Sequence, residues 1–200
     1  LAGDEASARA GQEQGGLGDI LCLESRVHGS RGIPGGWRLA PAQGGGMLYD
    51  WGVHLIDQVM SAFDFHMPKA VYCQLSHALG YEVDDGFRLA LDFSDATRAY
   101  VEVATCNFIS LPRFYLTARF GAARVEDWQH DGQLVRCLQW EEQGPNVRLM
   151  SPRDEKTTIG TSFALPASKQ GEIARNFCAA VRGEEALAVT PAQVESVMRV

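Results

Sequence analysis

A carboxylate and an imidazole stand at helical spacing in this sequence. Asp50 and His54 are four residues apart, so on an α-helix they lie one turn apart on the same face. At about 100° per residue, further polar side chains fall within about 80° of Asp50: Asp57, Gln58 and Ser61. A carboxylate beside an imidazole favours the charged ring and can fix its tautomer. A histidine held in this way can take a proton from a hydroxyl as general base, or return it as general acid.

The helix expected to position this stripe runs from Met47 to Phe63. Its opposite half is apolar, as a helix packed on a core requires: Leu55, Ile56, Val59, Met60 and Phe63. Beside the stripe, Trp51 could present an aromatic face to the apolar edge of a sugar. Glycines without side chains precede the helix and predict an open entrance that a ligand or another domain can approach: Gly44, Gly45 and Gly46.

Two other interpretations of the polar stripe stay open. An amphipathic helix with such a stripe commonly does no more than face water. A metal site at Asp50 and His54 is a weaker interpretation, since it needs a third and a fourth ligand. The remaining histidines show no supporting spacing: His28, His66, His77 and His130.

Length and composition limit the class of protein. The chain has 200 residues, which suit one good-sized domain, and its 46% hydrophobic and 22% charged residues are typical of a soluble globular protein. The net charge is −7 and basic residues are scattered, which disfavours nucleic-acid binding. No apolar run is long enough to span a bilayer, and no secretion leader is readable. We therefore expect a cytoplasmic protein with neither nucleic-acid nor membrane partners.

The cysteines favour free thiols. Their odd number argues against a disulfide framework, and their wide spacing without a CxxC pair suits no structural zinc site. Since free cysteine is commonly a small core hydrophobe, the expectation is buried, reduced thiols: Cys22, Cys73, Cys106, Cys137 and Cys178.

The pattern along the chain predicts an α+β fold. The turn Gly15 to Asp19 lacks the G-x-G-x-x-G spacing of a dinucleotide loop and precedes a predicted strand, Ile20 to Val27. A loop rich in Gly and Pro follows from Gly29 to Gly46. After Pro68, apolar and polar residues alternate in short segments, which indicates an antiparallel sheet covered on one face: Phe87 to Phe93, Tyr100 to Phe108, Phe114 to Phe120 and Leu134 to Trp140.

Connections and chain ends complete this picture. Hairpin connections are expected at residues 94–97 and 130–133, and residues 1–14 suggest a frayed helix or tail. Near the end, apolar residues recur at helical spacing until Gly183 stops the helix. Thr190 and Gln193 then form a capping box, and the helix that they open has barely begun at Val200. A domain truncated in its last helix is the expectation.

The helix and its glycines resemble the signature of a known family. Residues 44–57 read G-G-G-M-L-Y-D-W-G-V-H-L-I-D. They are similar to the approximate pattern G-G-G-x-L-x-D-x-G-x-H-x-x-D of the glucose–fructose oxidoreductase, inositol dehydrogenase and rhizopine-catabolism (Gfo/Idh/MocA) family. Other segments resemble the family too, so that the resemblance covers nearly the whole chain from about Gly15: Gly18 to Ile20, Trp37 and Arg38, Gly121 to Val125, and Phe177 to Pro191.

The resemblance implies that this chain is one domain of a two-domain protein. Family members have an N-terminal Rossmann domain for NAD or NADP and a C-terminal domain with an open, mostly antiparallel sheet and helices on one face. The second domain supplies substrate contacts, and its sheet face often makes dimer or tetramer contacts. Residues 15–200 are thus expected to be the C-terminal substrate and oligomerisation domain, with the Rossmann domain absent from this chain.

The resemblance also implies residue roles. His54 would be the proton-transfer residue and Asp50 its catalytic partner when a secondary alcohol on a sugar or cyclitol is oxidised and the nicotinamide takes hydride. The substrate-binding candidates are Trp37, Arg38, Trp51 and Asp57. Arg38 could bind an acidic group or several hydroxyls, or be a solvated loop charge, and Asp57 is assigned a structural or hydrogen-bonding role.

One family feature is missing from these residues. The lysine partner normally lies in a Glu-Lys-Pro motif of the Rossmann domain, and none of the lysines here has that context: Lys69, Lys156 and Lys169. The isolated chain is therefore expected to be inactive. The alternative is a non-enzymatic sugar-binding or dimerisation module of the same fold.

Overall fold

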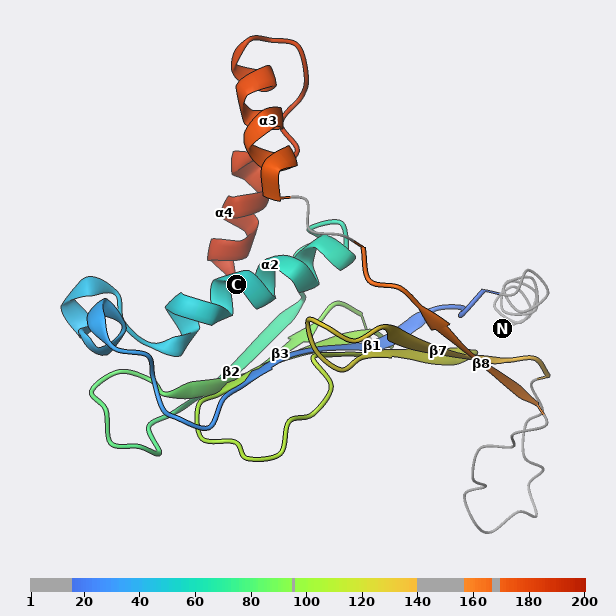
Figure 1. Cartoon of the computed structure of the whole chain (residues 1–200), viewed down its shortest axis with the longest axis horizontal. Helices are drawn as coiled ribbons and strands as arrows, with labels where there is room; N and C mark the ends of the chain where they lie inside the picture. The colour runs from blue at the N-terminus through green and yellow to red at the C-terminus, as the bar shows by residue number, and fades with distance from the viewer. Residues whose placement is uncertain (1–15, 95, 140–156, 167–169) are drawn as a thin grey trace.

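The fold is one broad sheet with its helices on a single face. The computed structural model describes residues 16–94, 96–139, 157–166 and 170–200 (Figure 1). The strands are β1 (Ile20–His28), β2 (Ala70–Ser76), β3 (Gly86–Asp92), β4 (Arg98–Ala104), β5 (Phe114–Ala118), β6 (Gly121–Val125), β7 (Gly132–Cys137) and β8 (Thr158–Phe163). The helices are the short turns η1 (Gly36–Leu39), η2 (Pro41–Gln43) and η3 (Leu48–Gly52), then α2 (Val53–Ala62), α3 (Gln170–Val181) and α4 (Pro191–Arg199).

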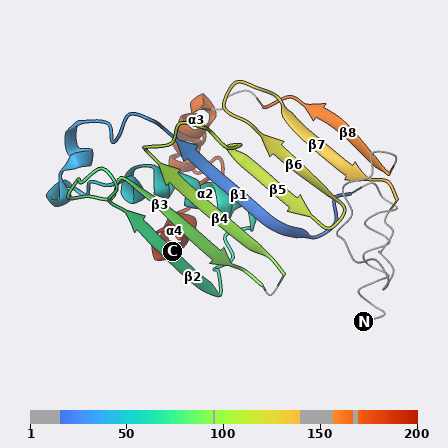
Figure 2. The same ribbon diagram turned by 90° about the horizontal axis from the view of Figure 1, so that it is seen from below.

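The sheet is open and almost wholly antiparallel. Its eight strands follow the order β2-β3-β4-β1-β5-β6-β7-β8, which Figure 2 shows from below. The first strand of the chain thus lies in the middle, where β1 pairs parallel to β4, with Cys22 opposite Arg98. Each of the other neighbouring pairs is antiparallel. The predicted open, mostly antiparallel sheet with helices on one face is confirmed.

The core lies between α2 and the central strands. Leu55, Val59 and Met60 of α2 are completely buried, as the apolar half of the predicted helix requires. They pack in one cluster with side chains of the sheet's covered face: Leu23, Phe87, Leu89, Leu91, Val101 and Val103. The ring of Phe63, just after α2, stacks on Phe93 with 4.2 Å between centroids. Helix α4 packs on α2, and α3 lies farther from the sheet (Figure 1).

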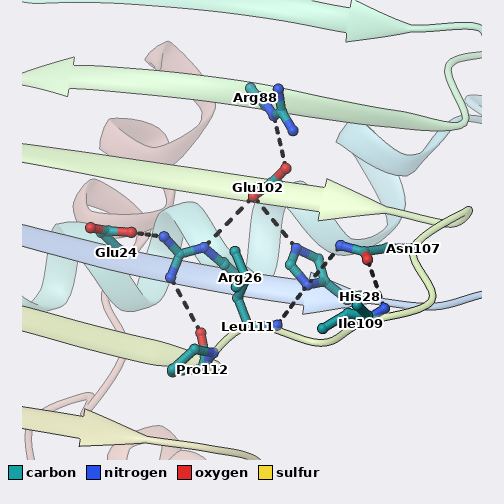
Figure 3. A network of polar contacts seen from close by, with 9 residues as sticks. All are labelled: Glu24, Arg26, His28, Arg88, Glu102, Asn107, Ile109, Leu111 and Pro112. Carbon is teal, nitrogen blue, oxygen red and sulfur yellow. Dashed lines mark hydrogen bonds and ion pairs between the residues drawn. The ribbon is translucent and has the colours of Figure 1, made fainter.

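None of the described helices covers the opposite face of the sheet, and charged side chains meet at its centre. Glu102 of β4 lies within ion-pair distance of Arg26, Arg88 and His28, at 3.6, 2.8 and 3.5 Å (Figure 3). Burial alone would raise the pKa of the Glu102 carboxyl, but its hydrogen bond to Arg88 and the charges nearby hold that pKa below its usual value. The charges at the centre of this open face are therefore already paired.

Several strand predictions hold and others fail. The strands predicted from residues 20, 87 and 114 and the hairpin connection at residues 94–97 are confirmed. The strand predicted over residues 100–108 is wrong at its end, because β4 stops at Ala104 and the chain turns to bond Gly29 and Gly32 of the loop after β1. Phe108 beyond this turn is 80% exposed. The connection predicted at residues 130–133 is too late, because β7 already begins at Gly132.

Helix ends follow the sequence closely. Thr190 and Gln193 form the predicted capping box at the start of α4. Gly183 has φ = +74° just after α3, as a helix stop requires. The expectation for residues 1–14 lies outside the described residues, as does Trp140. None of the helices in the described ranges has the length and apolar character that a membrane crossing requires.

The expectation of buried thiols is wrong. The five cysteines are free, but none of them is buried. Cys73 lies on the edge strand β2, Cys106 follows the end of β4, and Cys178 lies on an exposed side of α3, so neither strand alternation nor core packing encloses them.

Candidate active site

The candidate site is built around the entrance to α2. The predicted helix over residues 47–63 is confirmed in place, but its first turn, η3, is a π-helix. The buried Asp84, which precedes β3, holds this entrance at two points: its backbone oxygen accepts from Met47 N at 3.1 Å, and its carboxylate Oδ2 accepts from Leu48 N at 2.9 Å. Isolated π turns inside helices are frequent at functional sites.

The glycines before the helix have a different role from the one predicted. Gly45 N donates to Ala40 O at 3.0 Å, and Gly46 N donates to Arg38 O at 2.9 Å. A Cβ on Gly45 would lie 2.6 Å from Arg38 O, and one on Gly46 would collide with the Asp84 carboxylate. The glycines therefore allow the chain to pack against itself, and Gly45 and Gly46 are buried rather than open to a ligand.

The carboxylate of Asp50 pairs with an arginine instead of the expected histidine. Arg38 Nε donates to Asp50 Oδ2 at 2.6 Å, and the Asp50 side chain is only 12% exposed. The π turn closes with i→i+5 bonds and so takes more residues per turn than an α-helix, which rotates Asp50 relative to His54. Within the described part of the chain, the His54 ring makes no hydrogen bond and lies edge-on to Trp51, with 6.2 Å between centroids.

These side chains line one open cleft. It has a volume of about 520 Å³ and lies on the helix-bearing side of the molecule, where the exposed His54 ring borders it. Its lining combines three acid–base or charged groups with amide and aromatic side chains: Pro34, Arg38, Asp50, Trp51, His54, Gln58 and Trp128. Of the predicted site residues, the structure thus brings together Asp50, His54, Arg38 and Trp51.

Two predicted substrate-binding residues lie elsewhere. Trp37 is exposed and stacks under the Arg38 guanidinium, 4.9 Å from Cζ to ring centroid, outside the cleft lining. Asp57 lines a neighbouring apolar groove of about 430 Å³ between α2 and strands β1, β5 and β6. The polar stripe therefore divides: Asp50 and His54 line the cleft, Asp57 and Ser61 line the groove, and Gln58 lies between the two and lines both.

Sequence reasoning missed three residues of the site. Gln58 was visible on the polar stripe, four residues after His54, but amides give no distinctive motif. Trp128, in the connection from β6 to β7, and Arg113, directly before β5, come from segments far along the chain. No spacing rule joins them to residues 38–58, so only the tertiary fold reveals them.

Arg113 lies behind the cleft wall. It is 6% exposed, its Nη2 lies 3.4 Å from Gln58 Oε1, and its Cζ lies 3.2 Å from the centroid of the Trp128 ring. Burial lowers the pKa of its guanidinium to about 10. At neutral pH the group is still charged, so a cation sits behind the two cleft-lining side chains Gln58 and Trp128.

A metal centre is not assembled from these groups. Over residues 16–94, 96–139, 157–166 and 170–200, no three His, Cys, Asp or Glu side chains gather as ligands would. The arrangement instead offers an accessible imidazole, an ion pair beside it and a cation behind it. Such a set can move a proton and orient a polar ligand.

The chain is similar to one protein family over most of its length. Residues 6–124 match the family profile described as the GFO/IDH/MocA C-terminal domain. A Schizosaccharomyces pombe protein named an uncharacterised oxidoreductase is 33% identical over 110 residues, which are 52% of this chain and 29% of that protein. A second oxidoreductase of that yeast is 35% identical over 96 residues, or 46% of this chain and 26% of the relative.

Solved structures share the fold. A protein of Listeria innocua named as NAD-binding is 36% identical, with a TM-score of 0.81 over 96% of this chain and 57% of its own. A protein of Yersinia pestis named as an oxidoreductase has a TM-score of 0.74 over 98% of this chain and 56% of its own, at 18% identity, which speaks for the fold alone. The chain thus spans less than two thirds of the proteins that it matches.

Proposed function

This chain belongs to the GFO/IDH/MocA C-terminal domain family, and on that premise we propose that it is the substrate-binding and catalytic half of an NAD(P)-dependent oxidoreductase. The proposed substrate is a secondary alcohol, or the matching ketone, on a sugar, cyclitol or related polyol. His54 is the proposed proton-transfer residue. The family's Rossmann domain, which would hold NAD or NADP, is not among these residues.

The observation that carries this proposal is the accessible His54 imidazole in the cleft. A general base must reach the proton that it removes, and His54 combines exposure with a position on the rigid helix α2. The aromatic rings of Trp51 and Trp128 border the same cleft, as suits the apolar edges of a polyol ring. The ion pair of Asp50 with Arg38 keeps both charged groups oriented beside the imidazole.

The proposed proton transfer can be followed from the residues. When bound, the nicotinamide accepts a hydride from the carbinol carbon. His54 removes the proton of the hydroxyl on that carbon and becomes an imidazolium. Asp50 forms an ion pair with Arg38 at 2.6 Å, so its proposed role is to hold Arg38 in the cleft wall rather than to accept a hydrogen bond from the imidazolium. In the reverse direction the imidazolium returns the proton to the alkoxide.

The first prediction separates the two domains. The isolated chain of 200 residues should bind neither NAD nor NADP at micromolar concentration, because it lacks the glycine-rich dinucleotide loop. The full-length protein should bind one of them and reduce it in the presence of a polyol substrate. Calorimetric titration and absorbance at 340 nm measure the two results. Micromolar cofactor binding by the isolated chain would contradict the assignment of cofactor binding to the Rossmann domain. Sugar binding by the full-length protein without reduction of NAD(P) would favour a non-enzymatic module.

We further propose that the open face of the sheet joins copies of the protein into a dimer or tetramer, and that the protein is cytoplasmic. On the open face, aromatic side chains flank the paired charges around Glu102: Tyr72 is 69% exposed and Tyr100 is 43% exposed. An exposed apolar patch of this kind commonly marks an interface. The free cysteines among the described residues fit a reducing compartment.

The second prediction concerns this assembly. The full-length protein should form a stable homo-oligomer, and replacing Tyr72 and Tyr100 together with glutamate should shift it toward the monomer, because unpaired carboxylates are costly in an interface. Light scattering coupled to size exclusion measures the mass. The matched control places glutamate at the exposed Trp37, on the helix-bearing side, and should leave the mass unchanged. A monomer at high concentration for the unaltered full-length protein contradicts the proposal.

A further inference from the structure

We propose that the substrate of this site carries a carboxylate, and that Arg113 is the residue that recognises it. The inference rests on the proposed function and narrows its substrate class from polyols in general to acidic ones, such as sugar acids. It is carried by the position, burial and pairing of Arg113.

Arg113 is a buried cation without a carboxylate in the described structure. Among the described residues its side chain makes one hydrogen bond, in which Nη2 donates to Gln58 Oε1 at the long distance of 3.4 Å. An arginine carries five N–H donors, and a buried charge is normally paired because removing it from water is costly. Arg26 on the sheet's open face shows the usual solution, since its side chain is 14% exposed and pairs with both Glu24 and Glu102. Arg113 has no equivalent partner among the described residues.

Two of the guanidinium's three side-chain neighbours separate it from the cleft, and the third is the ring of Phe114, 5.0 Å from Cζ to centroid. Gln58 and Trp128 contact Arg113 on one side and line the cleft on the other. Trp128 is 64% exposed and lies in a connection rather than in a strand, so few contacts oppose a shift of its ring. A ligand carboxylate that displaces this ring, or replaces the Gln58 contact, meets a planar fork of donors suited to bidentate pairing.

The charges around the cleft favour an anion. Asp50 is the one carboxylate in the described lining, and Arg38 already neutralises it at 2.6 Å. The remaining charge is that of Arg113, so the cleft is locally positive in a chain whose net charge is −7. With a neutral polyol Arg113 would keep only its contacts with Gln58 and the aromatic rings, whereas a sugar acid would neutralise its charge.

The test compares acidic and neutral sugars that differ at one carbon. The full-length protein is assayed for NAD(P) reduction with D-glucuronate against D-glucose, D-galacturonate against D-galactose, and D-gluconate against D-glucitol. Binding of the same compounds is titrated separately by tryptophan fluorescence, to which Trp51 and Trp128 of the cleft lining contribute. We expect at least one acid to bind about 10-fold or more tightly than its neutral partner, and to have the higher kcat/KM.

Variants then assign the preference to Arg113. Arg113→Gln should weaken binding of that acid by about 10²- to 10³-fold, the usual cost of removing one partner of a buried charge pair, and should leave the neutral partner within about 3-fold. Arg113→Lys keeps the positive charge and is the variant to use if Arg113→Gln does not fold. Because lysine lacks the planar pair of donors of the guanidinium, this variant should weaken acid binding by about 10-fold. The matched control is Arg119→Gln, since Arg119 is an exposed arginine at the other end of β5 that faces Asp19; it should change nothing.

The outcomes separate this inference from the proposed function. Acids that bind through Arg113 without any NAD(P) reduction would sustain the inference and overturn the proposed function. If NAD(P) is reduced as efficiently with neutral sugars as with acids, the proposed function is sustained and the inference is overturned. The inference is overturned if no acid binds more tightly than its neutral partner in the titration. It is also overturned if Arg113→Lys weakens the binding of an acid and of its neutral partner equally. The latter result indicates that Arg113 pairs with a carboxylate from elsewhere in the full-length protein.

Discussion

Replacing His54 with alanine in the full-length protein is expected to lower kcat by about 10²–10⁴-fold, the usual contribution of a positioned acid–base group. The exposed imidazole borders the cleft, and no other histidine is part of the cleft lining described here. The variant should fold normally, because an exposed substitution changes stability by less than about 0.5 kcal/mol. Steady-state rates, with folding checked by circular dichroism, measure the effect.

Three further variants sharpen this result. His54→Asn should behave like the alanine variant, since it keeps some of the shape but has no titratable nitrogen. Asp50→Asn should cost less, because the Asp50 carboxylate pairs with Arg38 rather than with the imidazole. His66→Ala is the matched control: His66 is also exposed, near the far end of the same helix, but its ring bonds the backbone of Phe63 at 2.8 Å and lies outside the cleft. It should leave kcat unchanged.

Near-normal turnover of a well-folded His54→Ala protein would remove His54 from the mechanism. The helix would then be what its amphipathic pattern most commonly indicates, a packed element with a solvated polar face. A parallel fall in activity of His54→Ala and His66→Ala would point instead to damage of the helix as a whole.

The sequence predicts the helix well because its signals are local. Apolar residues at helical spacing identify the buried face, and Leu55, Val59 and Met60 are indeed completely buried. The capping box at Thr190 is equally local. The π turn is different, because Asp84 and Arg38 hold the first turn of the helix from outside it. Asp84 comes from a segment well beyond the helix in the sequence. A helical wheel assumes constant rotation, so it predicted a pair of Asp50 with His54 that does not form.

Strands are predictable where one face is buried and the other is not. β3 alternates clearly because α2 covers its Phe87, Leu89 and Leu91 side. The strands β2 and β8 lie at the two edges of the sheet, and nearly all their residues are exposed. Without a buried face their sequences need no alternation, so neither was predicted. Arg113 and Trp128 were missed for a different reason: their positions beside the cleft come from the packing of segments that are distant in the sequence.

Gly46→Ala should lower the free energy of unfolding by about 3–5 kcal/mol. Gly46 has φ = +108°, a region that costs a residue with a side chain about 1–2 kcal/mol. The new methyl group would also collide with the Asp84 carboxylate. Moving that carboxylate would weaken its hydrogen bond from Leu48 N, which contributes about 1 kcal/mol. Overpacking by the methyl group costs roughly 1–3 kcal/mol more. The midpoint of thermal unfolding, followed by circular dichroism, should fall by roughly 2–4 °C for each kcal/mol lost.

Gly44→Ala separates backbone strain from close packing. Gly44 also has a positive φ, +74°, but a Cβ there would meet no atom within 4 Å. This variant should therefore lose only the strain, about 1–2 kcal/mol, and should keep its kcat. Gly46→Ala should lose kcat as well, because the shifted entrance to the helix carries Asp50 and the cleft wall with it. Equal losses of stability in the two variants would mean that Asp84 does not brace the helix, and that the glycines matter for backbone conformation alone.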